Sequence, residues 1–193
     1  ADREPLAIDV DPEFDVFRKL DARETPPSIG QVFGEPRILA IVSSKATAPM
    51  QKAYRELVES WRSESHVIDV KLDTEVAALP RNQAVWLLGR DNRFAATLFG
   101  ARLRPDATEI RVDGETMPLA GHSVILTERH PQNAEKAVGW VFAEPLAAMP
   151  GLGATMGERG VETQHRQAQH DHGQQLLHHL FHLLRVCGAL DQA

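Results

Sequence analysis

A buried strand followed directly by an amphipathic helix, between residues 37 and 61, most constrains the fold of this chain. Residues 38–42 read Ile-Leu-Ala-Ile-Val, a continuous β-branched apolar run that is typical of a strand buried on both faces. Ser43, Ser44 and Thr47 can each cap a helix, and Pro49 suits its first turn. Apolar residues then recur at spacings of three and four: Met50, Ala53, Tyr54, Leu57, Val58 and Trp61. This pattern predicts a strand–helix unit of an α/β domain.

The remaining elements predict a three-layer α/β sandwich with a mixed, mostly parallel sheet of the Rossmann- or flavodoxin-like type. Further strands are expected at 66–72, 84–89, 123–127 and 137–143, and a short helix at 93–103. Asp113-Gly114 predicts a hairpin turn between 108–112 and 115–119. A polar loop is expected at 130–133, and a helical stretch from Pro145 that is broken by Pro150, Gly151 and Gly153. The acidic and basic residues Asp69, Lys71, Asp73 and Glu75 predict a solvated edge.

We expect three sections along the chain. Residues 1–36, with a proline-rich break at 25–28, predict a connector that lies on a neighbour and has little core of its own. Residues 37–157 are expected to form the α/β domain, which fits a total length of 193 residues. Residues 158–193 form a His-rich segment and a predicted C-terminal helix with the leucine stripe Leu176, Leu177, Leu180, Leu183 and Leu184.

Charge and composition exclude several classes of function. A formal net charge of -6 argues against a nucleic-acid or anionic-membrane surface. No apolar run approaches the ~20 residues that a membrane span needs, and no basic-then-apolar leader begins the sequence, so we expect neither a membrane span nor a signal peptide in it. Cys187 is the single cysteine, which excludes an intramolecular disulfide and a thiolate metal cluster.

A cluster of histidines near the C-terminus is a candidate metal site. His178 and His182 are four residues apart and share one face of a helix, and His170 and His172 can supply further imidazole ligands to Zn²⁺ or Ni²⁺. The alternative is that His178 and His182 lie opposite the leucine stripe on a solvated face. Both interpretations stay open at this point.

Two strand ends are candidate ligand sites, because open α/β sheets bind ligands beyond the carboxyl ends of their strands. One is Ser43-Ser44-Lys45, where helix N–H groups and a lysine can hold an anion, and the other contains Asp91 and Asn92. The alternative is ordinary capping and turn chemistry. No His-Glu-x-x-His motif occurs, so no zincin catalytic centre is expected.

Several segments resemble large bacterial metallopeptidases of the gluzincin, aminopeptidase-N-like group. Residues 11–20 (Asp-Pro-Glu-Phe-Asp-Val-Phe-Arg-Lys-Leu) and 24–28 (Glu-Thr-Pro-Pro-Ser) resemble a segment that follows the catalytic part of these enzymes. The similarity continues in patches to residue 153, at 84–89, 92–95, 122–124, 137–141 and 150–152. After Leu152 the chain departs from the pattern, since a polar, His-rich stretch stands where the family has a short helix and an aromatic, glycine-containing strand.

The resemblance implies a non-catalytic C-terminal α/β domain of a periplasmic or cell-envelope peptidase, with residues 1–20 as the run-out from a preceding β-rich domain. In such enzymes the zinc-binding helix lies upstream in a separate domain, so no catalytic residue and no cofactor carry over to this chain. Its partners are then neighbouring domains of the parent enzyme, or a second copy through the C-terminal helix. Two other functions stay open: a His-rich transition-metal-binding module and a small-ligand-binding α/β domain.

Overall fold

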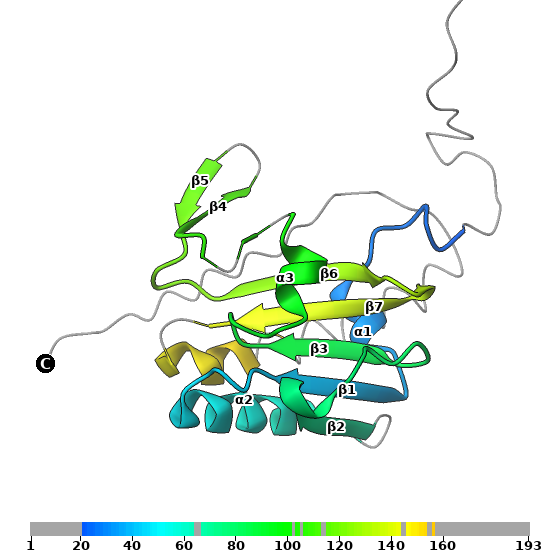
Figure 1. Cartoon of the computed structure of the whole chain (residues 1–193), viewed down its shortest axis with the longest axis horizontal. Coiled ribbons are helices and arrows are strands. Elements are labelled where there is room, and N and C mark those ends of the chain that lie inside the picture. Colours follow the sequence, from blue (N-terminus) through cyan, green and yellow to red (C-terminus); the bar gives the residue numbers. More distant parts are fainter. Residues whose placement is uncertain are drawn as a thin grey trace, which may run out of the picture.

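A five-stranded sheet forms the centre of the molecule (Figure 1). The computed structural model describes residues 21–63, 67–101, 103–104, 106–112, 115–143, 146–153 and 156. The strand order is β2-β1-β3-β7-β6, with β1 Arg37–Val42, β2 Val67–Leu72, β3 Ala84–Leu88, β6 Val124–His130 and β7 Asn133–Phe142. The first four strands in this order are parallel, and β6 is antiparallel to β7. The predicted mixed, mostly parallel sheet is therefore confirmed.

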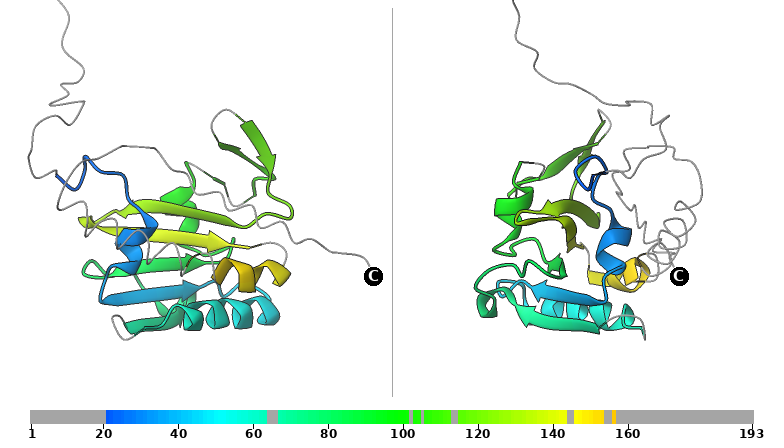
Figure 2. Two further views of the ribbon diagram at one scale, coloured as in Figure 1. Left: turned by 180° about the vertical axis from the view of Figure 1, so that it is seen from behind. Right: turned by 90° about the vertical axis from the view of Figure 1, so that its right-hand side faces the viewer.

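Helical segments cover both faces of this sheet (Figure 2). One face carries α1 (Ile29–Phe33), α2 (Ala48–Ser60) and the helical segment formed by η2 (Leu146–Ala148) and residues 149–153. The other face carries α3 (Ala95–Phe99) and apolar side chains from the hairpin of β4 (Glu109–Val112) and β5 (Glu115–Pro118). A single turn, η1 (Asp73–Glu75), follows β2. The predicted three-layer α/β sandwich is confirmed, while the predicted C-terminal helix lies outside the described residues.

The central strands are apolar throughout because both of their faces are buried. In β1, Ile38, Ala40 and Val42 pack in the core beneath α1 and α2, while Leu39 and Ile41 pack in the core beneath α3. All five residues of β3 are buried in the same alternating way. The continuous apolar runs in the sequence thus correspond to the middle of the sheet.

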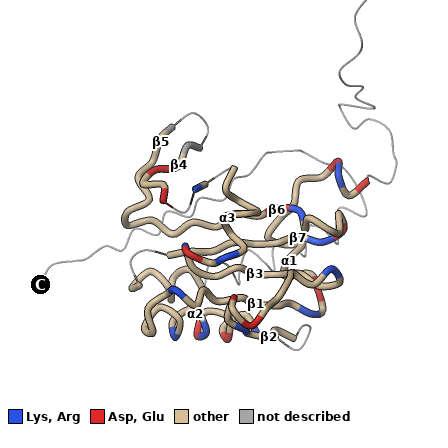
Figure 3. The backbone as a smooth tube through the Cα atoms, in the orientation of Figure 1, with Lys and Arg blue, Asp and Glu red and all other residues tan. Residues whose placement is uncertain are grey.

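The helix α2 forms where its sequence pattern predicts it. Thr47 is the extended N-cap residue and Pro49 stands in the first turn, where a missing N–H costs no intrahelical bond. Tyr54, Leu57 and Val58 are buried against the sheet. The opposite side of the helix is charged and exposed, as Figure 3 shows, and it includes the ion pair between Lys52 Nζ and Glu56 Oε1 at 3.7 Å.

The predicted polar loop at 130–133 is shorter in the structure, where it is a turn of residues 131 and 132. β6 continues to His130 and β7 begins at Asn133, so only residues 131 and 132 connect the two strands. The apolar runs marked the buried halves of this hairpin, and its polar half is held by backbone pairing and by Arg129. The Arg129 guanidinium donates to the carbonyl oxygens of Thr25 at 2.6 Å and Ala134 at 3.0 Å.

The expected break at Pro150 and Gly151 is also absent, since residues 149–153 are helical. Pro150 stands in the first turn of this stretch, where proline leaves no intrahelical partner unsatisfied. Met149 and Leu152 attach this helical stretch to the domain, because both side chains are buried in the core shared with α2.

The described part of the expected connector, residues 21–36, packs on the sheet. Ser28 caps α1 by accepting a hydrogen bond from the Gln31 N–H. Ile29, Val32 and Phe33 are buried in the same core as β1 and β3. Lys136 Nζ, on β7, is paired with Glu35 Oε2 at 2.6 Å. This segment therefore shares the core of the α/β domain.

Candidate functional site

The carboxyl ends of the four parallel strands meet at one edge of the sheet, where the predicted ligand-binding residues lie. The Ser43 N–H donates to the Leu88 carbonyl at 2.8 Å, which joins the end of β1 to the end of β3. The Asn92 side-chain amide donates to the Ile41 carbonyl at 2.8 Å. Ser43 and Asn92 are both buried, whereas Lys45 and Asp91 are exposed. The structure thus brings the two predicted segments together.

The carboxylate of Asp73 joins these two segments by hydrogen bonds, and the sequence analysis did not predict this role. Asp73 is only 2% exposed, so its predicted place on a solvated edge is wrong. Its Oδ1 accepts from the Ser44 N–H at 3.0 Å, and its Oδ2 accepts from the Arg93 N–H at 3.1 Å. Its position directly after the end of β2 was the available signal, because that end lies beside the end of β1.

The pKa of Asp73 reflects two opposing effects. Burial raises the pKa of this carboxyl group by penalising its charged form, and hydrogen bonds from Ser44, Arg93 and Thr74 lower it. The hydrogen bonds prevail, so the pKa lies below its ordinary value. Asp73 is therefore a charged acceptor that organises two loops.

Backbone packing leaves little room at this edge. Gly89 has φ +99°, and a Cβ there would lie 2.9 Å from the Ser43 Cβ. Its carbonyl accepts from the Trp140 indole N–H at 3.0 Å, and its N–H donates to the Val141 carbonyl at 2.9 Å. Close approach of β1, β3 and β7 thus requires glycine at this position.

Two arginines beside this edge are likewise engaged with the protein itself. Arg90 donates to the Ala107 carbonyl, and its guanidinium lies 5.7 Å from the ring centroid of Phe142. Arg93 donates to the Val76 carbonyl, and its guanidinium lies over its neighbour Phe94 at 4.6 Å. Through these contacts, the loop after β3 is held against the loop after β2 and against the segment that precedes β4.

The candidate metal ligands His170, His172, His178 and His182 lie outside the described residues. Within the part of the chain that the structure describes, no group of three or more His, Cys, Asp or Glu side chains is arranged to hold a metal ion.

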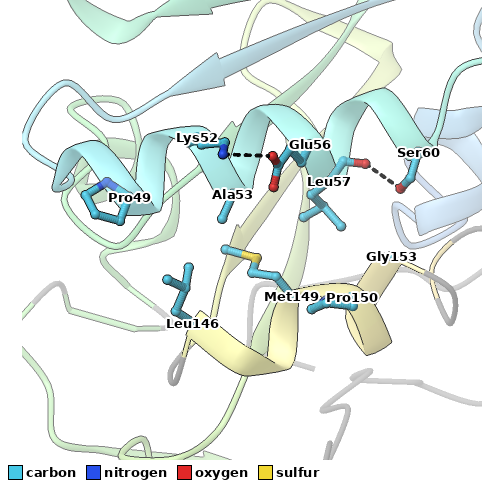
Figure 4. Close-up of a pocket in the computed structure, with 10 residues that line it drawn as sticks. All are labelled: Pro49, Lys52, Ala53, Glu56, Leu57, Ser60, Leu146, Met149, Pro150 and Gly153. Atoms are coloured by element: carbon cyan, nitrogen blue, oxygen red, sulfur yellow. Dashed lines mark hydrogen bonds and ion pairs between the residues drawn. The ribbon is translucent and has the colours of Figure 1, made fainter.

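A groove between α2 and the helical segment 146–153 is a second candidate site, and the sequence pattern did not single it out (Figure 4). Its volume is about 530 Å³, within the usual range for binding sites. The lining residues are Pro49, Lys52, Ala53, Glu56, Leu57, Ser60, Leu146, Met149, Pro150 and Gly153. Most of these are apolar, so the groove offers a hydrophobic surface rather than a polar pocket.

The two walls of the groove face each other with apolar side chains. Figure 4 shows Leu146 and Met149 extending towards α2, with Ala53 and Leu57 on the opposite wall. Leu146 is 42% exposed. The ion pair of Lys52 and Glu56 belongs to the α2 wall and balances its charge.

The groove is narrow at one end because Gly153 lies close to α2. A Cβ at Gly153 would lie 3.1 Å from the Ser60 Oγ and 3.2 Å from a methyl group of Leu57. Leu146 and Pro49 stand away from this contact, along the same walls. The lining residues on α2 run from Pro49 to Ser60, so the groove extends along this helix.

Comparisons of the chain with protein-family models, with curated proteins and with solved structures found no match. Across the described residues, no helix combines the length and the apolar character that crossing a membrane requires.

Proposed function

We propose that this chain is a non-catalytic interaction domain that docks an amphipathic helical segment in the groove between α2 and residues 146–153. One contrast within the molecule carries this proposal. At the carboxyl edge of the sheet, Ser43, Asp73 and Asn92 direct their polar atoms into hydrogen bonds within the protein. In the groove, Leu146, Pro49 and Pro150 are exposed, above the buried side chains of Leu57 and Met149.

We further propose that the parent protein is a bacterial metallopeptidase of the aminopeptidase-N-like group, acting in the periplasm or cell envelope. Support for the parent comes from the resemblance of residues 11–20, 24–28, 84–89 and 92–95 to the segments that follow the catalytic part of such enzymes. In this role the domain supplies no catalytic group, and it binds a neighbouring domain of the enzyme through its groove.

Activity measurements test the proposal directly. The chain alone is expected to show no hydrolysis of aminoacyl p-nitroanilides, with or without added Zn²⁺, while the full-length product of its gene hydrolyses them. In the full-length protein, Leu146→Asp should change KM or kcat without changing bound zinc, because it places a charge in an apolar contact.

Val67→Asp is the matched control, since Val67 is an equally apolar, 57% exposed side chain outside the groove. Zinc-dependent turnover by the chain alone would overturn the non-catalytic assignment. Equal effects of Leu146→Asp and Val67→Asp on the full-length enzyme would overturn the groove as its docking surface.

A further inference from the structure

We propose that two copies of this chain pair through the outer edge of β2 and form a dimer with one continuous sheet. β2 stands at the end of the strand order, and among the described elements no further strand pairs with it (Figure 1). The other edge strand, β6, contacts the segment before α1, because Thr127 Oγ1 donates to the Pro27 carbonyl at 2.9 Å. No residue of β2 lines the groove, so the inference goes beyond the proposed function and does not depend on it.

The backbone of β2 has a bonding pattern that suits the addition of a further strand. The Val67 N–H donates to the Pro36 carbonyl at 2.9 Å, so the backbone groups of Val67 face β1. Backbone groups of successive strand residues alternate in direction. The residues of β2 whose backbone groups face away from β1 are therefore Ile68, Val70 and Leu72. The Leu72 N–H donates to Glu75 Oε2 at 2.6 Å, which, within the part of the chain that the structure describes, leaves Ile68 and Val70 as donors for a partner strand.

The charges of β2 distinguish one register of pairing from the others. A two-fold axis perpendicular to the sheet pairs β2 with its own copy in antiparallel orientation. Residues with the same backbone direction then lie opposite each other, so the axis passes through a residue and not between two. An axis at Asp69 or at Lys71 places that charge opposite its own copy, and an axis at Ile68 pairs no opposite charges. An axis at Val70 places Asp69 opposite the partner's Lys71, twice in the dimer.

In the register centred on Val70, each face of the junction brings compatible side chains together. The two pairs of Asp69 with the partner's Lys71 fall at non-hydrogen-bonded positions, where opposite side chains are closest. On the face that carries α2, Val70 lies opposite its own copy and Ile68 lies opposite the partner's Leu72. Val70 and Leu72 are partly buried hydrophobic residues that pack against the core beneath α2. Dimerisation therefore extends this apolar layer across the two-fold axis.

The side chains of Asp69 and Lys71 are accessible to a second chain. Lys71 is exposed, and the Asp69 side chain is 51% exposed although its Oδ2 lies 3.6 Å from Arg37 Nη2 on β1. Charged residues on an edge strand usually prevent pairing with other strands. Here the acidic and the basic residue stand symmetrically about Val70, so a two-fold copy supplies the complementary charge to each. The charge pattern therefore favours a second copy of this chain as the partner.

Charge reversal at the two positions tests the interface. Sedimentation equilibrium should show a reversible dimer of the wild-type chain. Lys71→Asp and Asp69→Lys should each raise the dimer dissociation constant about tenfold or more, because two attractive pairs become two repulsive pairs. An equimolar mixture of the two variants should form a heterodimer, in which every aspartate at these positions again meets a lysine. Asp106→Lys is the matched control, since it also breaks an exposed aspartate–arginine pair, with Arg104, and should leave the dissociation constant unchanged.

Disulfide cross-linking locates the two-fold axis. In a Cys187→Ser background, Val70→Cys should form a covalent dimer under mild oxidation, because residue 70 lies opposite its own copy at about 5.5 Å between Cα atoms. Val67→Cys is the control, since Val67 is 57% exposed and yet the two copies of residue 67 are about 20 Å apart in this register. Cross-linking at position 67 and not at position 70 would overturn the proposal.

The sedimentation data can also overturn the proposal. A wild-type chain that stays monomeric up to about 1 mM would do so. The same conclusion would follow from a dimer with equal dissociation constants in the wild type, Lys71→Asp and Asp69→Lys, once circular dichroism has shown that the variants are folded. Leu146→Asp should leave the dissociation constant unchanged because it lies outside the β2 edge, so this test and the test of the groove can fail independently.

Discussion

The indole ring of Trp86 lies directly against Gly139 on the neighbouring strand. The register of β3 with β7 pairs these two residues, and a Cβ at position 139 would lie 2.1 Å from the Trp86 Cζ3 atom. Phe33 and Trp61 pack around the same indole, with ring centroids 5.3 Å and 5.5 Å away. The missing side chain at 139 thus makes room for the aromatic cluster that joins α1 and α2 to the sheet.

Gly139→Ala should therefore destabilise the fold by overpacking, by about 1–3 kcal/mol. The added methyl group would lie 2.1 Å from an atom of a fully buried ring. Urea denaturation followed by tryptophan fluorescence measures the change in the free energy of unfolding.

A double-mutant cycle separates overpacking from a backbone effect of glycine. Trp86→Leu removes the ring that the new methyl group meets, so Gly139→Ala should cost much less in the Trp86→Leu background. An unchanged cost in that background would contradict the steric explanation.

Asp73→Asn should lower the free energy of unfolding at pH 7 by about 1–3 kcal/mol, because the charged acceptor of two backbone N–H groups is lost. The folded-state pKa of Asp73 is depressed, so its contribution is present above the unfolded pKa of about 4 and is lost as pH falls through the folded-state pKa. The difference between wild type and Asp73→Asn should thus shrink below pH 4.

Chemical denaturation at a series of pH values from 2.5 to 7 measures this difference. Asp106→Asn is a suitable control, since Asp106 pairs with Arg104 on the surface and is exposed. A difference between wild type and Asp73→Asn that does not depend on pH would contradict the role assigned to the carboxylate.

His130 should make the fold sensitive to mild acid. Burial lowers the pKa of its imidazole, and the charge of Arg81 lowers it further. The neutral ring is buried in β6, and its Nδ1 accepts a hydrogen bond from the Gln132 N–H. Stability is therefore expected to fall as pH drops below the unfolded histidine pKa of about 6.5 and through the folded-state pKa.

His130→Asn should remove this acid sensitivity between pH 5 and 7.5, because asparagine does not titrate and its side-chain oxygen can take the place of Nδ1. Thermal unfolding at several pH values provides the measurement. His122→Asn should keep the wild-type dependence of the unfolding temperature on pH. If His122→Asn abolishes that dependence and His130→Asn keeps it, His130 is not the responsible group.

The elements of the sheet were predictable where burial dictates the residue pattern. The runs at 38–42 and 84–88 are apolar because both of their faces are covered, and α2 has one apolar face because one side meets the sheet. The hairpin flanking Asp113-Gly114 followed from turn chemistry, and β4 and β5 confirm its strands. Local pattern and tertiary environment agree in these segments.

Features that depend on contacts between distant segments were not predictable in the same way. Asp73 resembles any surface aspartate in the sequence, and its burial follows only from the loops that donate to it. The polar half of the β6–β7 hairpin lacks the apolar alternation of a strand, and backbone pairing together with Arg129 holds it. The groove arises from the placement of residues 146–153 beside α2, which no local pattern encodes.

Differential scanning calorimetry of this domain, alone and within the full-length gene product, tests the interaction-domain account most directly. Docking of a neighbouring domain stabilises the form that binds it, so the unfolding temperature of this domain should be higher in the full-length protein than in the isolated chain. Leu146→Asp should abolish that difference, and Val67→Asp should preserve it. Equal unfolding temperatures in the two contexts, or a difference that survives Leu146→Asp, would contradict the account.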